Sequence, residues 1–272
     1  MISQRFETPG RVALDLRLAE GEIEVETSET ETTEVAVDAR GSDDAVRELL
    51  EATRIEHRQS GDRHEVRVLV PKQRGFFRRS VDVEITVRAP QGADLRAQAV
   101  SADTYGRGRF GSVAVESASG DVELGATEDA AVKSASGDVR IESTGGDASV
   151  STASGDVTLG PVAGLVNVKS ASGDVSVREA ASDVSVSTAS GDVVLGAVVR
   201  GRVELRTASG DLEVGIAKGS NVWVDARSLS GDTSSELELT GEEPVGDGPL
   251  VSVKVRTASG DIRILRAPAS AG

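Results

Sequence analysis

The sequence predicts an all-β protein: a single β-solenoid made of coils of about 18 residues, each with two short strands and two turns. Three observations lead to this fold class. A hexapeptide recurs at nearly constant spacing, pairs of apolar residues step by nine residues, and aromatic residues make up only 2% of the chain. A narrow two-sheet stack can fill its core with Val, Leu, Ile and Ala, whereas a compact globule usually contains more large rings.

The hexapeptide is Ser/Thr-Ala-Ser-Gly-Asp-Val, and its glycines follow one another at intervals of 17, 18, 18, 18, 19, 21 and 29 residues. Glycine in third place suits a type II turn, which requires a positive φ angle there. The alanine before the serine, for example Ala171, is expected to point inward at a corner too tight for a larger side chain. We therefore predict a structural turn column. Its Gly/Asp pairs are Gly120/Asp121, Gly137/Asp138, Gly155/Asp156, Gly173/Asp174, Gly191/Asp192, Gly210/Asp211 and Gly260/Asp261, with a further copy at Gly231/Asp232 and a weaker one at Ala102/Asp103.

Each period also contains two apolar-polar-apolar triplets, as in Val175/Val177 and Val184/Val186. This alternation is typical of a strand with one buried face. Two such strands leave about four residues for each turn, which excludes a helix within the coil. Successive coils are expected to stack at the usual strand separation of about 4.8 Å.

The first 90 residues are less regular. Strand patterns continue there, and Ser42 is suited to cap a short helix whose apolar face contains Val46, Leu49 and Leu50. A helix near the end of a solenoid can cover an open sheet edge. The sequence thus predicts an irregular N-terminal cap over residues 1–90, a regular solenoid over 91–266 and a tail over 267–272.

Composition limits the classes of function. The formal net charge of −15 opposes non-specific attraction to nucleic acid, so we expect no nucleic-acid partner. There is no cysteine, which excludes disulfides and thiolate metal sites. The N-terminus lacks the apolar segment of a secretory signal, and no stretch approaches the length of a transmembrane segment, so a cytoplasmic location, in part peripheral to the membrane, is expected.

The recurring Ser-Ala-Ser-Gly-Asp-Val, the Val-x-Val strands before it and the segment Val-Arg-Ala-Pro-Gln-Gly-Ala-Asp-Leu resemble the DUF4097 β-strand-repeat family, whose members often carry the label adhesin. The resemblance covers nearly the whole chain. It implies a bacterial β-solenoid associated with the cell envelope or its stress response, and it brings no catalytic residues.

Two groups of residues could bind a metal ion. The aspartates of the turn column would lie one per coil, but calcium-binding solenoid repeats use a Gly-Gly-x-Gly-x-Asp pattern that this repeat lacks. His57 and His64 flank a Gly61-Asp62 turn without an evident third ligand, so polar residues beside a hairpin turn are the simpler interpretation. We expect no metal, no cofactor and no catalytic residue.

One segment contrasts with the acidic background. It carries four positive charges around two phenylalanines, a combination suited to an anionic lipid surface or an acidic protein, although a solvated hairpin loop or rings folded back on the cap would give the same pattern. The candidate docking loop consists of Lys72, Arg74, Phe76, Phe77, Arg78 and Arg79.

These observations together predict a non-enzymatic structural or interaction module linked to the bacterial envelope or to envelope stress. Its partner would be a protein or an anionic surface that the sequence does not identify. The alternative is an exported adhesin or glycan-binding module. A monomer or a weak end-to-end oligomer is expected.

Overall fold

The computed structural model describes residues 1–72, 81–237 and 248–268. It divides into two compact units, Met1–Gly137 and Asp138–Gly272. Apart from one helix, the regular structure in the described residues consists of β-strands, and most neighbouring strands are parallel. The predicted β-solenoid with one short helix is therefore confirmed. In the described ranges, no helix combines the length and the apolar character needed to cross a bilayer.

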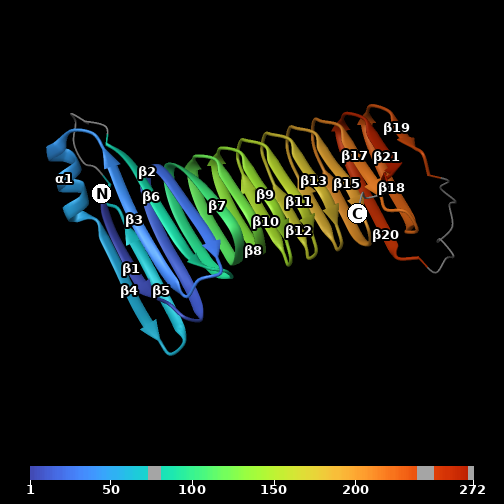
Figure 1. The fold of residues 1–272 in the computed structure, drawn as a ribbon. Coiled ribbons are helices and arrows are strands. Elements are labelled where there is room, and N and C mark those ends of the chain that lie inside the picture. The colour runs from blue at the N-terminus through green and yellow to red at the C-terminus, as the bar shows by residue number, and fades with distance from the viewer. Residues whose placement is uncertain (73–80, 238–247, 269–272) are drawn as a thin grey trace. The chain divides into compact units, whose positions relative to one another are not determined.

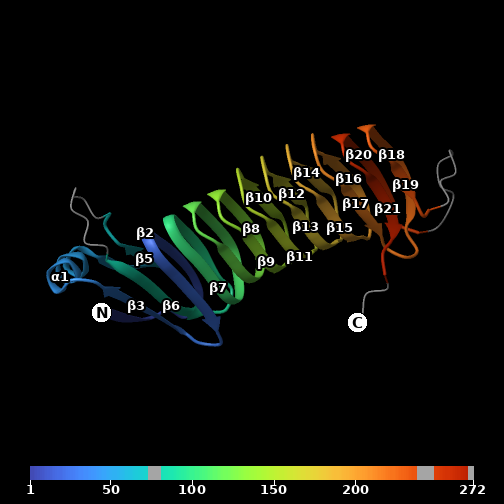
Figure 2. The ribbon, with the colours of Figure 1, turned by 90° about the horizontal axis from the view of Figure 1, so that it is seen from above.

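In the second unit, the strands form two parallel rows (Figure 2). The first row contains, in spatial order, β9 (Val139–Thr144), β11 (Val157–Val162), β13 (Val175–Ala180), β15 (Val193–Val198), β17 (Leu212–Ile216), β21 (Ile262–Arg266) and β19 (Thr233–Ser235). The second row contains β10 (Ala148–Thr152), β12 (Val166–Lys169), β14 (Val184–Ser187), β16 (Gly201–Arg206), β20 (Leu250–Ser259) and β18 (Asn221–Ser230).

The spatial order at the end of these rows differs from the order along the chain. The coil of β20 and β21 comes last in the sequence, yet it lies between the coil of β16 and β17 and the coil of β18 and β19 (Figure 1). Residues 206–211 and 256–261, which have the same sequence, Arg-Thr-Ala-Ser-Gly-Asp, lie in adjacent coils.

The core of the second unit consists of apolar columns between the two rows. The triplets predicted from the nine-residue step supply them, and each column places equivalent residues of successive coils against one another. One column contains Val139, Val157, Val175, Val193, Leu212 and Ile262, all at most 1% exposed. Removal of these side chains from water supplies about 1.5–3 kcal/mol for each, which is the main favourable contribution to folding.

In the first unit, β2 (Arg11–Ser28) forms a complete coil by itself. It pairs in parallel with β7 (Ala93–Ser119) on one side and with both β5 (Arg63–Leu69) and β6 (Asp82–Pro90) on the other. The next coil follows where β7 pairs with β8 (Val122–Ser136). β5, β6 and β7 all follow β2 in the chain, so here too later strands pair with a strand that comes earlier in the sequence.

The N-terminal end of this unit changes to antiparallel pairing. β3 (Thr32–Arg40) pairs with β6, β1 (Ile2–Glu7) pairs with β3, and β4 (Arg54–Ser60) pairs with β5. The predicted helix is present as α1 (Asp43–Ala52), which begins after Ser42 and lies beside β3 (Figure 1). Of its predicted apolar face, only Leu49 is buried.

The Ser-Gly-Asp corner of each coil differs from the prediction in one respect. The alanines of the hexapeptide, such as Ala171 and Ala189, are exposed and do not point inward. The inward place belongs mostly to the Ser or Thr one residue earlier. In Thr188, for example, the hydroxyl donates a hydrogen bond of 2.9 Å to the carbonyl oxygen of Ser190, which satisfies a polar group that burial would otherwise leave unpaired.

The turn glycines have positive φ, +119° at Gly173. A Cβ atom added at Gly173 would overlap the carbonyl oxygen of Gly155 in the neighbouring coil. We expect Gly173→Val to lower the free energy of unfolding by about 2–4 kcal/mol, because it adds both backbone strain and a steric overlap. Ser176→Ala, at an exposed strand position, is expected to change it by less than about 0.5 kcal/mol.

Chemical denaturation of the two variants, followed by circular dichroism, measures this difference. Ser176 lies in the strand directly after the turn, so it serves as the matched control. Equal destabilisation by both substitutions would contradict the close approach of the coils at Gly173.

Candidate functional site

The aspartates of the turn column form a ladder of hydrogen bonds between coils. The Oδ1 atom of Asp156 accepts a bond of 2.8 Å from the backbone N–H of Asp174, and Asp174 Oδ1 accepts the equivalent bond from Asp192. The same contact joins Asp103 to Asp121 in the first unit. In the second unit the remaining bonds run from Asp156 N–H to Asp138, from Asp211 to Asp192, from Asp261 to Asp211 and from Asp232 to Asp261.

Each of these bonds gives the accepting carboxylate a backbone partner in the neighbouring coil. Neighbouring aspartates repel one another by about 1 kcal/mol in water at the strand spacing, and the charge-assisted bond to the backbone offsets this cost. Within the described residues, no group of three or more His, Cys, Asp or Glu side chains is arranged to hold a metal ion. The carboxylates of the column thus act as acceptors for backbone N–H groups of the neighbouring coil.

Sequence inspection missed one member of this column. Gly21 aligns with Ala102 across β2 and β7, and Glu22 aligns with Asp103. Gly21 has a φ of +124°, in the range of the other turn glycines, so Ala-Glu-Gly-Glu-Ile is an early copy of Ala-Ser-Gly-Asp-Val. The available signal was the Gly followed by an acidic and a branched apolar residue.

Glu22 lies among other carboxylates at this corner. Partial burial, followed by the charge of Glu84 on the adjacent strand, raises the pKa of Glu22 above its ordinary value. Glu24, Asp103 and Asp82 act in the same direction. The first unit therefore presents a strongly anionic corner beside its turn column.

The two histidines form a contact that the sequence did not predict. The hairpin at Gly61 is present, but His64 is only 2% exposed, and its Nδ1 lies 3.0 Å from Nε2 of His57. The two rings stack with centroids 5.3 Å apart, and Phe6 of β1 lies 4.9 Å from the His57 ring. The two histidines flank the hairpin turn as predicted, but His64 is buried, because β4 packs against β5 and its His57 ring contacts Phe6 of β1.

The buried His64 also has an unpaired atom. One of the two rings donates the shared hydrogen bond, and Nε2 of His64 is buried with no hydrogen-bond partner. Burial, followed by the neighbouring His64, lowers the pKa of His57. His57 therefore resists protonation in the folded protein.

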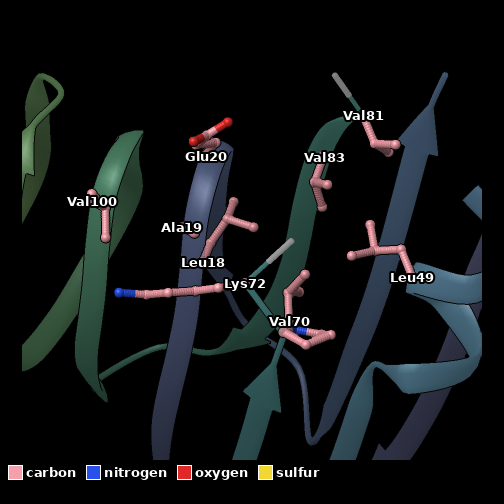
Figure 3. Close-up of a pocket in the computed structure, with 10 residues that line it drawn as sticks. Leu18, Ala19, Glu20, Leu49, Val70, Lys72, Val81, Val83 and Val100 are labelled. Carbon is pink, nitrogen blue, oxygen red and sulfur yellow. The ribbon is translucent and has the colours of Figure 1, made fainter. Parts of the chain in front are cut away.

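A small cavity lies beside the C-terminal end of β5, whereas His64 is near the start of that strand. It has a volume of about 290 Å³ and its wall is mostly aliphatic (Figure 3). The lining residues are Leu18, Ala19, Glu20, Leu49, Val70, Pro71, Lys72, Val81, Val83 and Val100. This volume is near the lower limit of about 300 Å³ for small-molecule pockets, so the cavity has room for a small apolar group.

Only one residue of the predicted docking loop can be placed. Lys72 is exposed at the border of this cavity, and its ammonium forms no ion pair with a described carboxylate. Arg74, Phe76, Phe77, Arg78 and Arg79 lie outside the described residues. The docking role of this segment stays a prediction.

Comparison with known proteins gives one family and several solved structures. The family model described as Toastrack DUF4097 matches residues 12–265. Similar solved structures include a protein from Parabacteroides distasonis provisionally described as lipid binding, with 12% identity and a TM-score of 0.42, and one from Bacteroides fragilis provisionally described as an adhesin, with 9% identity and a TM-score of 0.40. Each comparison covers 96% of both chains. No curated protein matches the sequence.

The aspartate ladder predicts different effects for two substitutions at Asp174. Asp174→Ala removes the acceptor for the N–H of Asp192 and is expected to cost about 1 kcal/mol of stability. Asp174→Asn keeps an acceptor oxygen while it removes one charge, so its stability should remain within about 0.5 kcal/mol of the wild type. Thermal denaturation with millimolar calcium or with a chelator should give the same Tm for the wild-type protein.

The two substitutions control for one another, since both remove the charge and only one removes the acceptor. Equal losses of stability would contradict the ladder. A Tm that rises with calcium would identify the carboxylates as metal ligands.

The histidine pair predicts a pH dependence. Because the pKa of His57 is lower in the folded protein than its ordinary value of 6.5, its contribution to stability is present above about pH 6.5 and is lost as the pH falls through the folded-state pKa. We expect the Tm of the wild type to fall between about pH 7 and pH 5, and the fall to be smaller in His57→Gln, which cannot take up a proton there. Identical pH profiles of the two proteins would contradict this role.

Proposed function

Because the chain belongs to the Toastrack DUF4097 family, we propose that it is a non-enzymatic interaction module that acts at the bacterial cell envelope or in the response to envelope stress. The observation that carries this proposal is the regular repetition of its outward surface. In the second unit, each strand row places one outward side chain per coil in a straight column. One such column contains Ser149, Asn167, Ser185 and Glu204.

Such a surface suits binding over an extended area. Solenoid repeats create long, continuous faces, and partners contact several repeats at once. Along β10, β12 and β14 the outward residues are mainly small and polar, so short side chains cover the sheet there. Binding energy would then come from a few larger residues placed on that regular background.

A second candidate function is an exported adhesin or glycan-binding module. One observation favours it: Trp223, the only tryptophan of the chain, is 45% exposed on the outward side of β18. An exposed indole on a flat, charged sheet can stack on a sugar ring.

The native, untrimmed gene product distinguishes these functions by its location. We expect the tagged protein to co-fractionate with the envelope, and a deletion strain to become more sensitive to a cell-wall antibiotic. Complementation with the Ser176→Ala variant should restore resistance, whereas Gly173→Val should not, because it destabilises the fold. Recovery only in the cytosol, with unchanged sensitivity of the deletion strain, would contradict an envelope function.

Protease treatment of intact cells separates the two candidates. Digestion of the protein from outside would favour the adhesin, and protection would favour the module inside the cell.

A further inference from the structure

Strands β16, β20 and β18 are neighbours in the second unit (Figure 2). Their pairing places nine outward side chains in register. We call this array the cationic face. Across the three strands, the first line contains Arg202, Ser252 and Trp223, the second contains Glu204, Lys254 and Asp225, and the third contains Arg206, Arg256 and Arg227.

The charge of this face is opposite to that of the protein. It contains five cationic and two anionic side chains, a net charge of +3, whereas the whole chain carries −15. Residues 138–272 contain 12 Lys and Arg against 19 Asp and Glu, so the remainder of this segment is strongly anionic. The face is therefore a local positive region that can orient the molecule toward an anionic ligand.

The arginines form a continuous column. Parallel pairing places Arg206 beside Arg256 and Arg256 beside Arg227, with about 4.8 Å between strands. Like charges at this spacing repel one another, and only two carboxylates lie among them. An anionic ligand that spans the column would relieve this repulsion.

The two carboxylates of the face hold the guanidinium groups in place. Glu204 pairs with Arg206, and the Oδ1 atom of Asp225 accepts a bond of 3.0 Å from Nε of Arg227. Arg256 lies 3.9 Å from the other oxygen of Asp225. The side chains of Arg206, Arg227 and Arg256 remain 59%, 68% and 46% exposed. Their remaining N–H groups can thus bind carboxylates in the bidentate geometry that arginine favours.

Trp223 lies at one corner of the face. It is 45% exposed, and its register neighbour on β20 is the small Ser252, so no large side chain flanks the indole on that side. An indole offers a flat apolar surface and one N–H donor. This combination fits a sugar ring, which has an apolar face and polar edges.

We propose that the cationic face binds an acidic polysaccharide, with sugar carboxylates on the arginine column and a sugar ring on Trp223. This inference rests on the proposed function as an interaction module. The two carboxylates within the face and the net charge of −15 disfavour a nucleic acid, whose phosphates are more densely spaced. A single apolar residue among nine also gives little to insert into a lipid bilayer.

Affinity electrophoresis of the purified full chain in gels that contain polygalacturonate tests this proposal. Fully methyl-esterified polygalacturonate has the same sugar backbone without the charge, and vesicles that contain phosphatidylglycerol provide the membrane alternative. We expect saturable binding to polygalacturonate that weakens with salt. Binding to the methyl ester should be at least about tenfold weaker.

Paired variants locate the site. Arg206→Glu/Arg256→Glu should weaken binding by about tenfold or more, and Trp223→Ala by several-fold. Arg140→Glu/Arg178→Glu changes the net charge by the same amount at exposed positions of the other strand row, so it should bind like the wild type. Circular dichroism melts verify that each variant is folded.

The proposal is overturned if the wild type does not bind polygalacturonate at low salt, if the control pair loses as much affinity as the face pair, or if vesicles bind and the polymer does not. Equal binding of the methyl ester would also overturn it, because the carboxylates would then have no role. These measurements use purified protein, so their failure leaves the envelope experiment above unaffected.

Discussion

The close contact between successive coils at the Ser-Gly-Asp corner determines the register of the stack. A glycine with positive φ allows the carbonyl oxygen of the neighbouring coil to approach where a Cβ atom would lie, as at Gly173 and Gly155. Beside it, the carboxylate of one coil accepts the N–H of the next, as between Asp156 and Asp174. Both contacts recur once per coil. The remaining residues of each coil are therefore brought opposite their equivalents in the next coil. A one-residue slip would turn the apolar triplets outward.

This register converts sequence period into surface chemistry. An outward side chain that recurs at one position of the repeat becomes a column at the strand spacing, whatever its charge. In the turn column, the aspartates tolerate their mutual repulsion because carboxylates along the ladder, such as those of Asp156 and Asp174, also accept backbone N–H groups. In the cationic face, Arg206, Arg256 and Arg227 have only two carboxylates nearby, so the same geometry leaves a positive column exposed. The regularly spaced aspartates therefore have a structural role, whereas the regularly spaced arginines remain available to bind a ligand.

The sequence was sufficient to predict the structure of one coil but not the order in which the coils stack. The period of the Ser-Gly-Asp motif and the nine-residue step depend on local turn and strand chemistry, so they predicted the strands and the turn glycines. The apolar pattern after Ser42 predicted the short helix. Stacking order depends instead on which copy fits which neighbour, and copies this similar differ little in local preference. Identity of the turn segment does not reveal this order, because residues 149–157 and 185–193 are also identical and lie two coils apart. The buried contact between His57 and His64 had no local signal either, because it arises only when β4 packs against β1 and β5.

The order of coils also explains where the cationic face arises. If the coils stacked in chain order, β18 would lie next to β16, and Arg256 would lie outside the line between Arg206 and Arg227. Strand β20, which follows β18 in the chain, instead enters between them, which brings Lys254 between Glu204 and Asp225 and completes the arginine column. The alternation of Glu204, Lys254 and Asp225 favours this order electrostatically, because the ammonium of Lys254 separates the two carboxylates. The same insertion that satisfies the acidic residues of β16 and β18 therefore assembles the three exposed arginines.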